Sequence, residues 1–160
     1  SISKGLTGGF LPMGITLAKE EIFQAFISDS PKKTFWHGHS FTANPLGCAA
    51  ANASLDLLEK DPNKYLSFER KHYFHLEKFR KLPFVKNIRV TGTIAAFDIE
   101  IGNNQGYLNN IGKKIKALSI KKGLFIRPLG NVIYLLPPLC ITENQLEKSY
   151  SIIFEILVNL

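Results

Sequence analysis

Lys4, close to the start of the chain, lies among residues that suit a reactive amine. It is part of the run Ser-Ile-Ser-Lys-Gly-Leu-Thr-Gly-Gly, between Ile2 and Leu6 and immediately before a glycine. Apolar neighbours predict partial desolvation of the ammonium group, which lowers its pKa and frees the amine to attack carbonyl groups. The glycines permit positive φ angles and let the backbone approach a bulky ligand. Taken alone, the run also fits an ordinary turn after a strand-end lysine.

Two further stretches carry side chains that suit anionic ligands. Trp36 begins Trp-His-Gly-His-Ser-Phe-Thr-Ala-Asn-Pro-Leu-Gly-Cys-Ala-Ala-Ala, in which Ser40 offers a hydroxyl and a backbone N–H to a phosphate. Phe125 begins Phe-Ile-Arg-Pro-Leu-Gly, in which Arg127 ends an apolar run where a solvated charge is not expected. A planar guanidinium there suits bidentate capture of a carboxylate. A structural ion pair at a strand end is the alternative for Arg127.

The histidines and cysteines do not indicate a metal site. His37 and His39 flank one glycine, but no carboxylate follows at a useful spacing, and the glycine suits a loop, so metal binding is rejected. Packing of a loop at an interface is the simpler interpretation for His37 and Trp36. Cys48 and Cys140 have neither metal-type spacing nor partners for a disulfide framework, which fits a reducing cytoplasm.

Charge and hydropathy argue against two classes of partner. The net charge of +7 comes mainly from lysines scattered along the chain. No stacking aromatic residues are interleaved with these lysines, so nucleic-acid binding is not expected. No apolar run approaches the roughly 18 residues of a membrane span, so no membrane partner is expected either.

In this order, the three motifs resemble those of the class-III aminotransferases, which depend on pyridoxal 5'-phosphate (PLP). The resemblance covers nearly the whole chain but only the C-terminal part of such an enzyme, so we expect the sequence, which starts without Met, to be a fragment. The resemblance is strongest to the branch of this family that acts in biotin synthesis. It implies transfer of an amino group from S-adenosylmethionine to 8-amino-7-oxononanoate, giving 7,8-diaminononanoate. The alternatives are another class-III ω-aminotransferase (acting on ornithine, 4-aminobutyrate or a diamine) and an inactive gene remnant or dimerisation module.

The resemblance also implies a role for particular residues. Lys4 would hold the cofactor and shuttle a proton. Ser40 and the backbone of His39 would reach the phosphate of the neighbouring subunit's cofactor, which requires a homodimer. Gly38 would lie near the substrate, and Arg127 would bind the substrate carboxylate. The carboxylate facing the pyridine nitrogen, the Gly/Ser phosphate loop and the ring-stacking aromatic would lie upstream of Ser1, so the chain alone is expected to be inactive.

The expected fold is α/β, of the fold-type-I PLP transferases. Residues 1–60 would end the PLP-binding large domain, and residues 61–160 would form an α+β small domain with an antiparallel sheet and helices on one face. Periodicity and turn residues predict helices at 19–28, 44–60, 64–81, 108–122 and from 142, strands at 14–18, 87–91, 94–101, 124–127 and 132–136, and a loop at 103–106. Asn44 before Pro45 predicts a helix cap, and Thr142 with Gln145 predicts a capping box.

Overall fold

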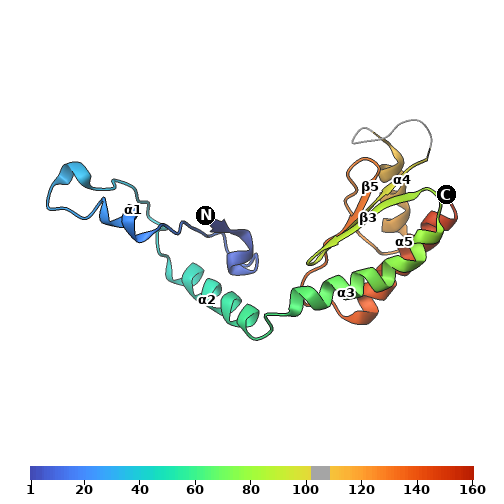
Figure 1. Ribbon diagram of the computed structural model, residues 1–160, viewed down its shortest axis with the longest axis horizontal. Coiled ribbons are helices and arrows are strands. Elements are labelled where there is room, and N and C mark those ends of the chain that lie inside the picture. Colours follow the sequence, from blue (N-terminus) through green and yellow to red (C-terminus); the bar gives the residue numbers. More distant parts are fainter. Residues whose placement is uncertain (102–108) are drawn as a thin grey trace. The chain divides into compact units, whose positions relative to one another are not determined.

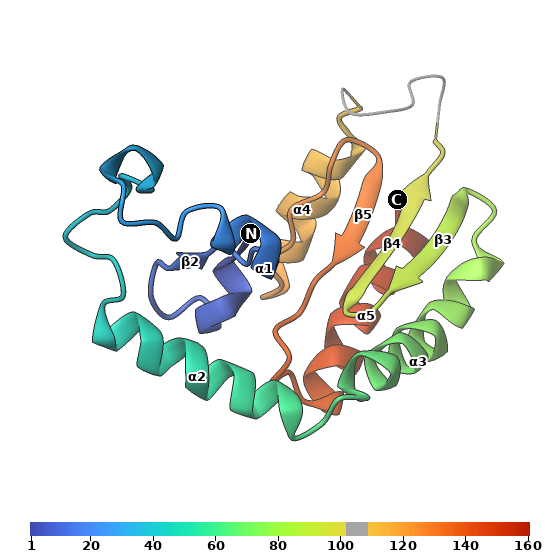
Figure 2. The same ribbon diagram turned by 60° about the vertical axis from the view of Figure 1, so that its left-hand side comes forward.

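The chain forms two compact units, residues 1–62 and 63–160, which are described separately (Figures 1 and 2). The computed structural model describes residues 1–101 and 109–160. The loop predicted at 103–106 lies outside the described residues. Within the described ranges, no helix has the length and apolar character needed to cross a membrane.

The first unit is built around one long helix and two short paired strands. Its elements are β1 (Ile2–Ser3), the 3-10 turn η1 (Lys4–Thr7), β2 (Gly14–Ile15), α1 (Glu20–Gln24), the 3-10 turn η2 (Pro31–Lys33) and α2 (Pro45–Glu59). β1 and β2 are antiparallel, with Ile2 opposite Ile15. The predictions of a strand at 14–18 and a helix at 19–28 were too long. Helix α1 has no side-chain cap and buries no residue within this unit, so tertiary packing does not extend it.

Helix α2 begins where the sequence predicts. The Asn44 side-chain oxygen accepts a hydrogen bond from the Gly47 backbone N–H at 2.7 Å, and Pro45 occupies the first helical position. Gly47 is itself required, because a Cβ there would lie 2.9 Å from the Asn44 side chain and from the sulfur of Met13. The capped first turn of α2 therefore packs directly against the segment that follows η1.

The second unit is an α+β module with a three-stranded antiparallel sheet in the order β3-β4-β5 (Figure 2). Its elements are α3 (Lys64–Leu76), the 3-10 turn η3 (Glu77–Lys81), β3 (Val85–Thr91), β4 (Ile94–Ile99), α4 (Ile111–Lys121), β5 (Val132–Leu135) and α5 (Glu143–Val158). The register of β3 against β4 shifts between Lys86 and Arg89, which marks a bulge.

One core joins the sheet to the three helices of this unit. Alternate residues of β4, namely Ala95, Phe97 and Ile99, are fully buried, as period-two alternation requires for one covered face. They pack with residues of α3, η3, β5, α4 and α5: Leu76, Phe79, Ile133, Ile115, Leu146, Tyr150, Ile153, Ile156 and Leu157. The predicted capping box of α5 is confirmed, since Gln145 N–H donates to Thr142 Oγ1 at 3.3 Å and Thr142 N–H donates to the Gln145 side chain at 3.0 Å.

The strand predicted at 124–127 is wrong. Within residues 1–101 and 109–160 these residues have no strand partner. The bridge that follows them joins Leu129 and Val132, with N–O distances of 2.9 Å in both directions. Pro128 has no backbone N–H to continue a ladder. The turn that follows packs instead against α4, where Gly112 leaves room for it. The sheet therefore ends at β5, and Arg127 lies on an irregular segment.

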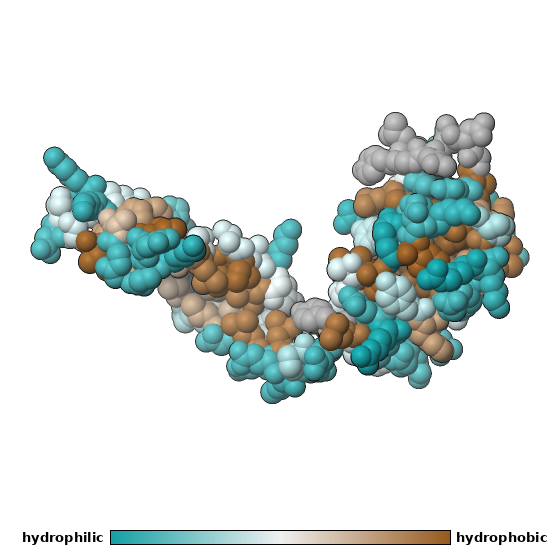
Figure 3. All heavy atoms as spheres, viewed as in Figure 1, coloured by the Kyte–Doolittle hydropathy of each residue, from teal (hydrophilic) through white to brown (hydrophobic). Residues whose placement is uncertain are grey.

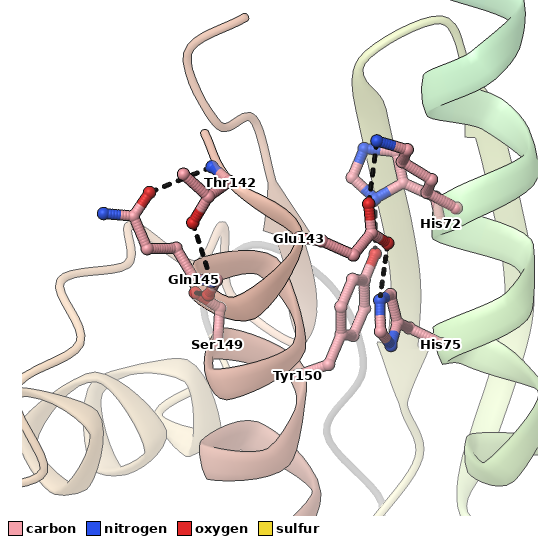
Figure 4. Close-up of polar contacts among 8 residues, drawn as sticks. His72, His75, Thr142, Glu143, Gln145, Ser149 and Tyr150 are labelled. Carbon is pink, nitrogen blue, oxygen red and sulfur yellow. Dashed lines mark hydrogen bonds and ion pairs between the residues drawn. The ribbon is translucent and has the colours of Figure 1, made fainter. Parts of the chain in front are cut away.

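The buried face of α3 differs from the predicted one and contains two histidines. Leu66 and Tyr73, predicted among its apolar residues, are exposed, whereas His72 and His75 are buried. The His72 Nε2–H donates to the Thr93 carbonyl at 3.1 Å, because a carbonyl can only accept. Its Nδ1 therefore accepts from the Tyr150 hydroxyl at 2.6 Å (Figure 4).

His75 completes this polar cluster between α3 and α5. Its ring stacks on Tyr150, with centroids 5.0 Å apart and planes at 16°. Its buried Nε2 has no hydrogen-bond partner among the described residues, since the Glu143 carboxylate oxygen is 3.8 Å away (Figure 4). Desolvation is the main cause that lowers the pKa of both His72 and His75. The hydrogen-bonded Lys71 ammonium, 2.8 Å away, is the main cause that lowers the pKa of Glu143.

Acid should therefore destabilise the second unit. Because the folded-state pKa values of His72 and His75 lie below the ordinary 6.5, the unfolded chain binds more protons in this range. The free energy of unfolding should be fully retained above pH 6.5 and decrease as the pH falls from 6.5 toward the lowered values. Urea unfolding of the 160-residue chain at a series of pH values measures this decrease. His72→Gln should reduce the pH dependence and the exposed His37→Gln should not; equal slopes in the two variants would contradict the assignment.

Candidate active site

Lys4 has an unusual backbone conformation at the start of η1. Its φ is +51°, in the left-handed region that non-glycine residues seldom adopt. Such a conformation costs about 1–2 kcal/mol and persists only where the surrounding structure imposes it, which occurs preferentially at functional sites. Lys4 lines a pocket together with Ser3, Gly9, Leu11, Pro12 and Met13. The lysine is therefore held at some energetic cost beside a pocket.

Helix α2 and the glycine turn hold this conformation. Ser54 Oγ on α2 donates to the Gly5 carbonyl at 3.2 Å, and Gly8 ends η1 in the left-handed conformation. The buried Thr7 donates its hydroxyl to the Leu11 carbonyl at 2.6 Å. These bonds close the turn after the lysine, and Gly8 and Gly9 adopt positive φ angles of 63° and 81°, which the sequence predicts that the glycines permit.

The expected desolvation of Lys4 is not provided by the residues described here. Lys4 is exposed, and of its two apolar neighbours in the sequence Leu6 is buried while Ile2 is itself 43% exposed. No ion pair involves Lys4 within residues 1–101 and 109–160. The amine is therefore accessible and is not neutralised by a carboxylate of the described residues.

The loop of residues 37–42 forms a small turn that presents Ser40. The His39 backbone N–H donates to Thr42 Oγ1 at 3.1 Å, the Thr42 N–H donates to the His39 carbonyl at 3.0 Å, and the Phe41 N–H donates to His39 Nδ1 at 3.2 Å. Ser40 is exposed within this turn. At Gly38 the space that a Cβ would occupy is open. The His39 N–H already has a partner, which leaves the Ser40 hydroxyl and N–H as the groups of this turn most suited to a phosphate.

The residues around this loop leave much apolar surface uncovered within the first unit. Trp36 and Phe41 are 82% and 75% exposed, and Phe10 is 81% exposed. Figure 3 shows apolar surface on the same unit. Within the described residues, the Trp36 indole N–H donates to the Pro31 carbonyl at 3.3 Å, and the His37 ring contacts the rings of Phe35 and His39. Packing of Trp36 and His37 at an interface stays a prediction.

Arg127 lies in the second unit, on the wall of a separate pocket. The pocket is lined by Leu124, Phe125, Ile126, Arg127, Tyr134, Leu135, Leu136, Pro137, Pro138, Ile141 and Ser149. Contrary to expectation, Arg127 is exposed, because the irregular backbone before Pro128 turns it out of the core. No ion pair involves Arg127 in the described part of the chain.

The lining of this pocket combines one cation with apolar walls. Tyr134, which the sequence left undecided between core and site, is half-buried and lines the pocket with Arg127. The pattern of β5 contained the signal, since Tyr134 alternates with the buried Ile133 and Leu135. A guanidinium beside prolines and aliphatic side chains suits a ligand with a carboxylate and a hydrocarbon chain.

Residues 1–157 match the family described as aminotransferase class-III. The chain belongs to the class-III aminotransferase family. It is 49% identical over 156 residues to the adenosylmethionine-8-amino-7-oxononanoate aminotransferase of Synechococcus elongatus, covering 98% of this chain and 37% of that protein. The crystal structure of the enzyme of the same name from Methanocaldococcus jannaschii has a TM-score of 0.84 and 32% identity, over 98% of this chain and 37% of that one.

A third relative links the family to its cofactor. The PLP-bound crystal structure of an amine transaminase from an uncultivated Pseudomonas species has a TM-score of 0.82 and 26% identity. The match covers 98% of this chain and 37% of that one. The predicted α/β fold of this aminotransferase family is thereby confirmed. The chain spans a little over one third of the length of these aminotransferases. No cluster of three or more potential metal ligands occurs within the described ranges.

Proposed function

We propose that this chain is the C-terminal part of a PLP-dependent aminotransferase of biotin biosynthesis. The complete enzyme would transfer an amino group from S-adenosylmethionine to 8-amino-7-oxononanoate and release 7,8-diaminononanoate. The observation that carries the reaction class is Lys4, an accessible amine without an ion pair among the described residues, held at positive φ beside a pocket. The choice of substrates rests on the 49% identity to the Synechococcus elongatus relative.

The groups of the first unit fit PLP chemically. The Lys4 amine would hold the cofactor through its aldehyde, and the Ser40 turn, with the His39 backbone and Gly38 beside it, would face a phosphate and the substrate. When bound, PLP supplies an electron sink for the substrate carbon. The part of this chain in the reaction would be to move a proton to and from that carbon with the Lys4 amine. A phosphate at Ser40 of the opposite subunit would make the active site dependent on a homodimer.

Arg127 would recognise the substrate carboxylate. Its guanidinium lacks a carboxylate partner among the described residues and borders an apolar pocket. 8-Amino-7-oxononanoate carries a carboxylate at the end of an aliphatic chain, so both kinds of group in the pocket would be used. Residues 1–60 would then end the PLP-binding domain and residues 61–160 would form the small domain of a cytoplasmic enzyme.

A hybrid enzyme tests the proposal. This chain would replace the matching 156-residue segment of the Synechococcus elongatus relative, and the purified protein would be loaded with PLP. Formation of 7,8-diaminononanoate from S-adenosylmethionine and 8-amino-7-oxononanoate is the expected result. A hybrid that instead uses ornithine, 4-aminobutyrate or a diamine would identify another ω-aminotransferase, and a folded but inactive hybrid would indicate a remnant.

A further inference from the structure

Helix α4 approaches the turn after Arg127 more closely than any side chain would permit. A Cβ at Gly112 would lie 2.2 Å from the Gly130 carbonyl oxygen and 2.8 Å from Pro128 Cβ. Both neighbours belong to backbone or to a rigid ring, so neither can rotate away from an added methyl group. Gly112 is buried at this contact. Only glycine at position 112 is compatible with the observed distance between helix and turn.

The other side of the same turn is fastened to the sheet. Leu129 and Val132 exchange two backbone hydrogen bonds of 2.9 Å. The Ile99 N–H donates to the Asn131 carbonyl at 2.9 Å, and the Asn131 side-chain amide donates to the Ile99 carbonyl at 3.2 Å. The turn is thus clamped between β4 and α4, and a residue larger than glycine at 112 must displace it or the helix.

Arg127 depends on this clamp for its position. It directly precedes Pro128, whose ring is one of the two contacts of Gly112. The guanidinium is exposed and has no ion pair within residues 1–101 and 109–160, so its backbone attachment is the main restraint on where it lies. We propose that Gly112 is a positioning residue for substrate binding, which acts by holding the turn at residues 128–131 where Arg127 reaches its pocket. The effect on substrate rests on the function proposed above.

The first test uses the 160-residue chain and does not depend on activity. In the NMR spectrum of the ¹⁵N-labelled protein, Gly112→Ala should shift the Arg127 Nε–H signal and the backbone amide signals of residues 129–131. The exposed neighbour variant Lys113→Ala should leave those signals in place. Unmoved signals in a folded Gly112→Ala chain would overturn the inference, whatever the enzyme proves to catalyse.

The second test uses the active hybrid enzyme and separates positioning from folding. Gly112→Ala should raise the KM for 8-amino-7-oxononanoate by about tenfold with kcat changed much less, because misplacing a binding group by about 1 Å is enough for such losses. Ile153→Val, mildly destabilising in the core of the same unit, should leave KM unchanged. In an Arg127→Lys background, Gly112→Ala should add little to KM, since the two residues act through one contact.

Two results would refute the role of Gly112. One is that Gly112→Ala raises KM by the same factor with and without the Arg127→Lys substitution. The other is that Gly112→Ala lowers the melting temperature but leaves KM unchanged. If Gly112→Ala does not fold, Asn131→Ala replaces it, because it loosens the same turn without adding atoms and should raise KM in the same way. An inactive parent hybrid would count against the proposed function alone, and the signals of the 160-residue chain would still decide the positioning role.

Discussion

Replacing Lys4 with alanine should reduce amino transfer by the hybrid enzyme by at least about 10³-fold, in the range expected for loss of a general acid–base group. The physical reason is that the Lys4 amine is the group placed to hold the cofactor and to move the substrate proton. Initial rates of 7,8-diaminononanoate formation measure the loss. The exposed Lys33→Ala is the matched control and should keep full activity, since Lys33 lies in η2 and not beside the pocket.

Two further measurements separate the chemical role of Lys4 from a structural one. Borohydride reduction of the PLP-loaded hybrid, followed by peptide mapping, should place the pyridoxyl group on Lys4. Lys4→Gly should also be inactive and yet at least as stable as the parent, because glycine adopts the φ of +51° without strain. A pyridoxyl group on another lysine, or loss of folding in Lys4→Gly, would contradict the proposed role.

Arg127→Lys should weaken binding of the carboxylate substrate about 10- to 100-fold, equivalent to about 1.4–2.8 kcal/mol. Lysine keeps the positive charge but cannot form the paired hydrogen bonds of a guanidinium with a carboxylate. The KM for 8-amino-7-oxononanoate measures the effect. The melting temperature should change little, because Arg127 is exposed and makes no ion pair with the described residues.

A matched change elsewhere in the unit serves as the control for Arg127. Arg89 pairs with Asp98 on the sheet at 2.9 Å, outside the pocket. Arg89→Lys should therefore leave KM unchanged. If Arg127→Lys instead lowers the melting temperature strongly while KM stays at the parent value, the arginine has a structural role and the carboxylate site lies elsewhere.

Local signals in the sequence were sufficient to predict the capped helices and the α+β character of the second unit. Asn44 before Pro45 and the Thr142–Gln145 box act within a single helical turn, so neighbouring residues alone determine them. The long apolar periodicities of α2 and α5 and the β-branched residues of β3 likewise predict their own element types. The three candidate motifs were also visible in the sequence, since each depends on residue types at fixed spacing.

Tertiary contacts determine the structure of residues 124–127 and the buried face of α3, which the local sequence patterns predicted wrongly. Residues 124–127 have the composition of a strand, but they have no pairing partner among the described residues, and the turn that follows them packs against α4 at Gly112 instead. His72 and His75 look polar, yet Tyr150 and the Thr93 carbonyl make burial of the α3 face that carries them possible.

Exposure of the site residues was likewise decided by packing. Lys4 is exposed although it lies between two apolar residues, because Leu6 is buried in the fold and Ile2 is itself exposed. Residues adjacent along the chain thus suggest a reactive amine at Lys4, but they do not determine its exposure. Which groups are buried, accessible or held in place depends on residues far away in sequence, such as Ser54 for Lys4 and Gly112 for Arg127.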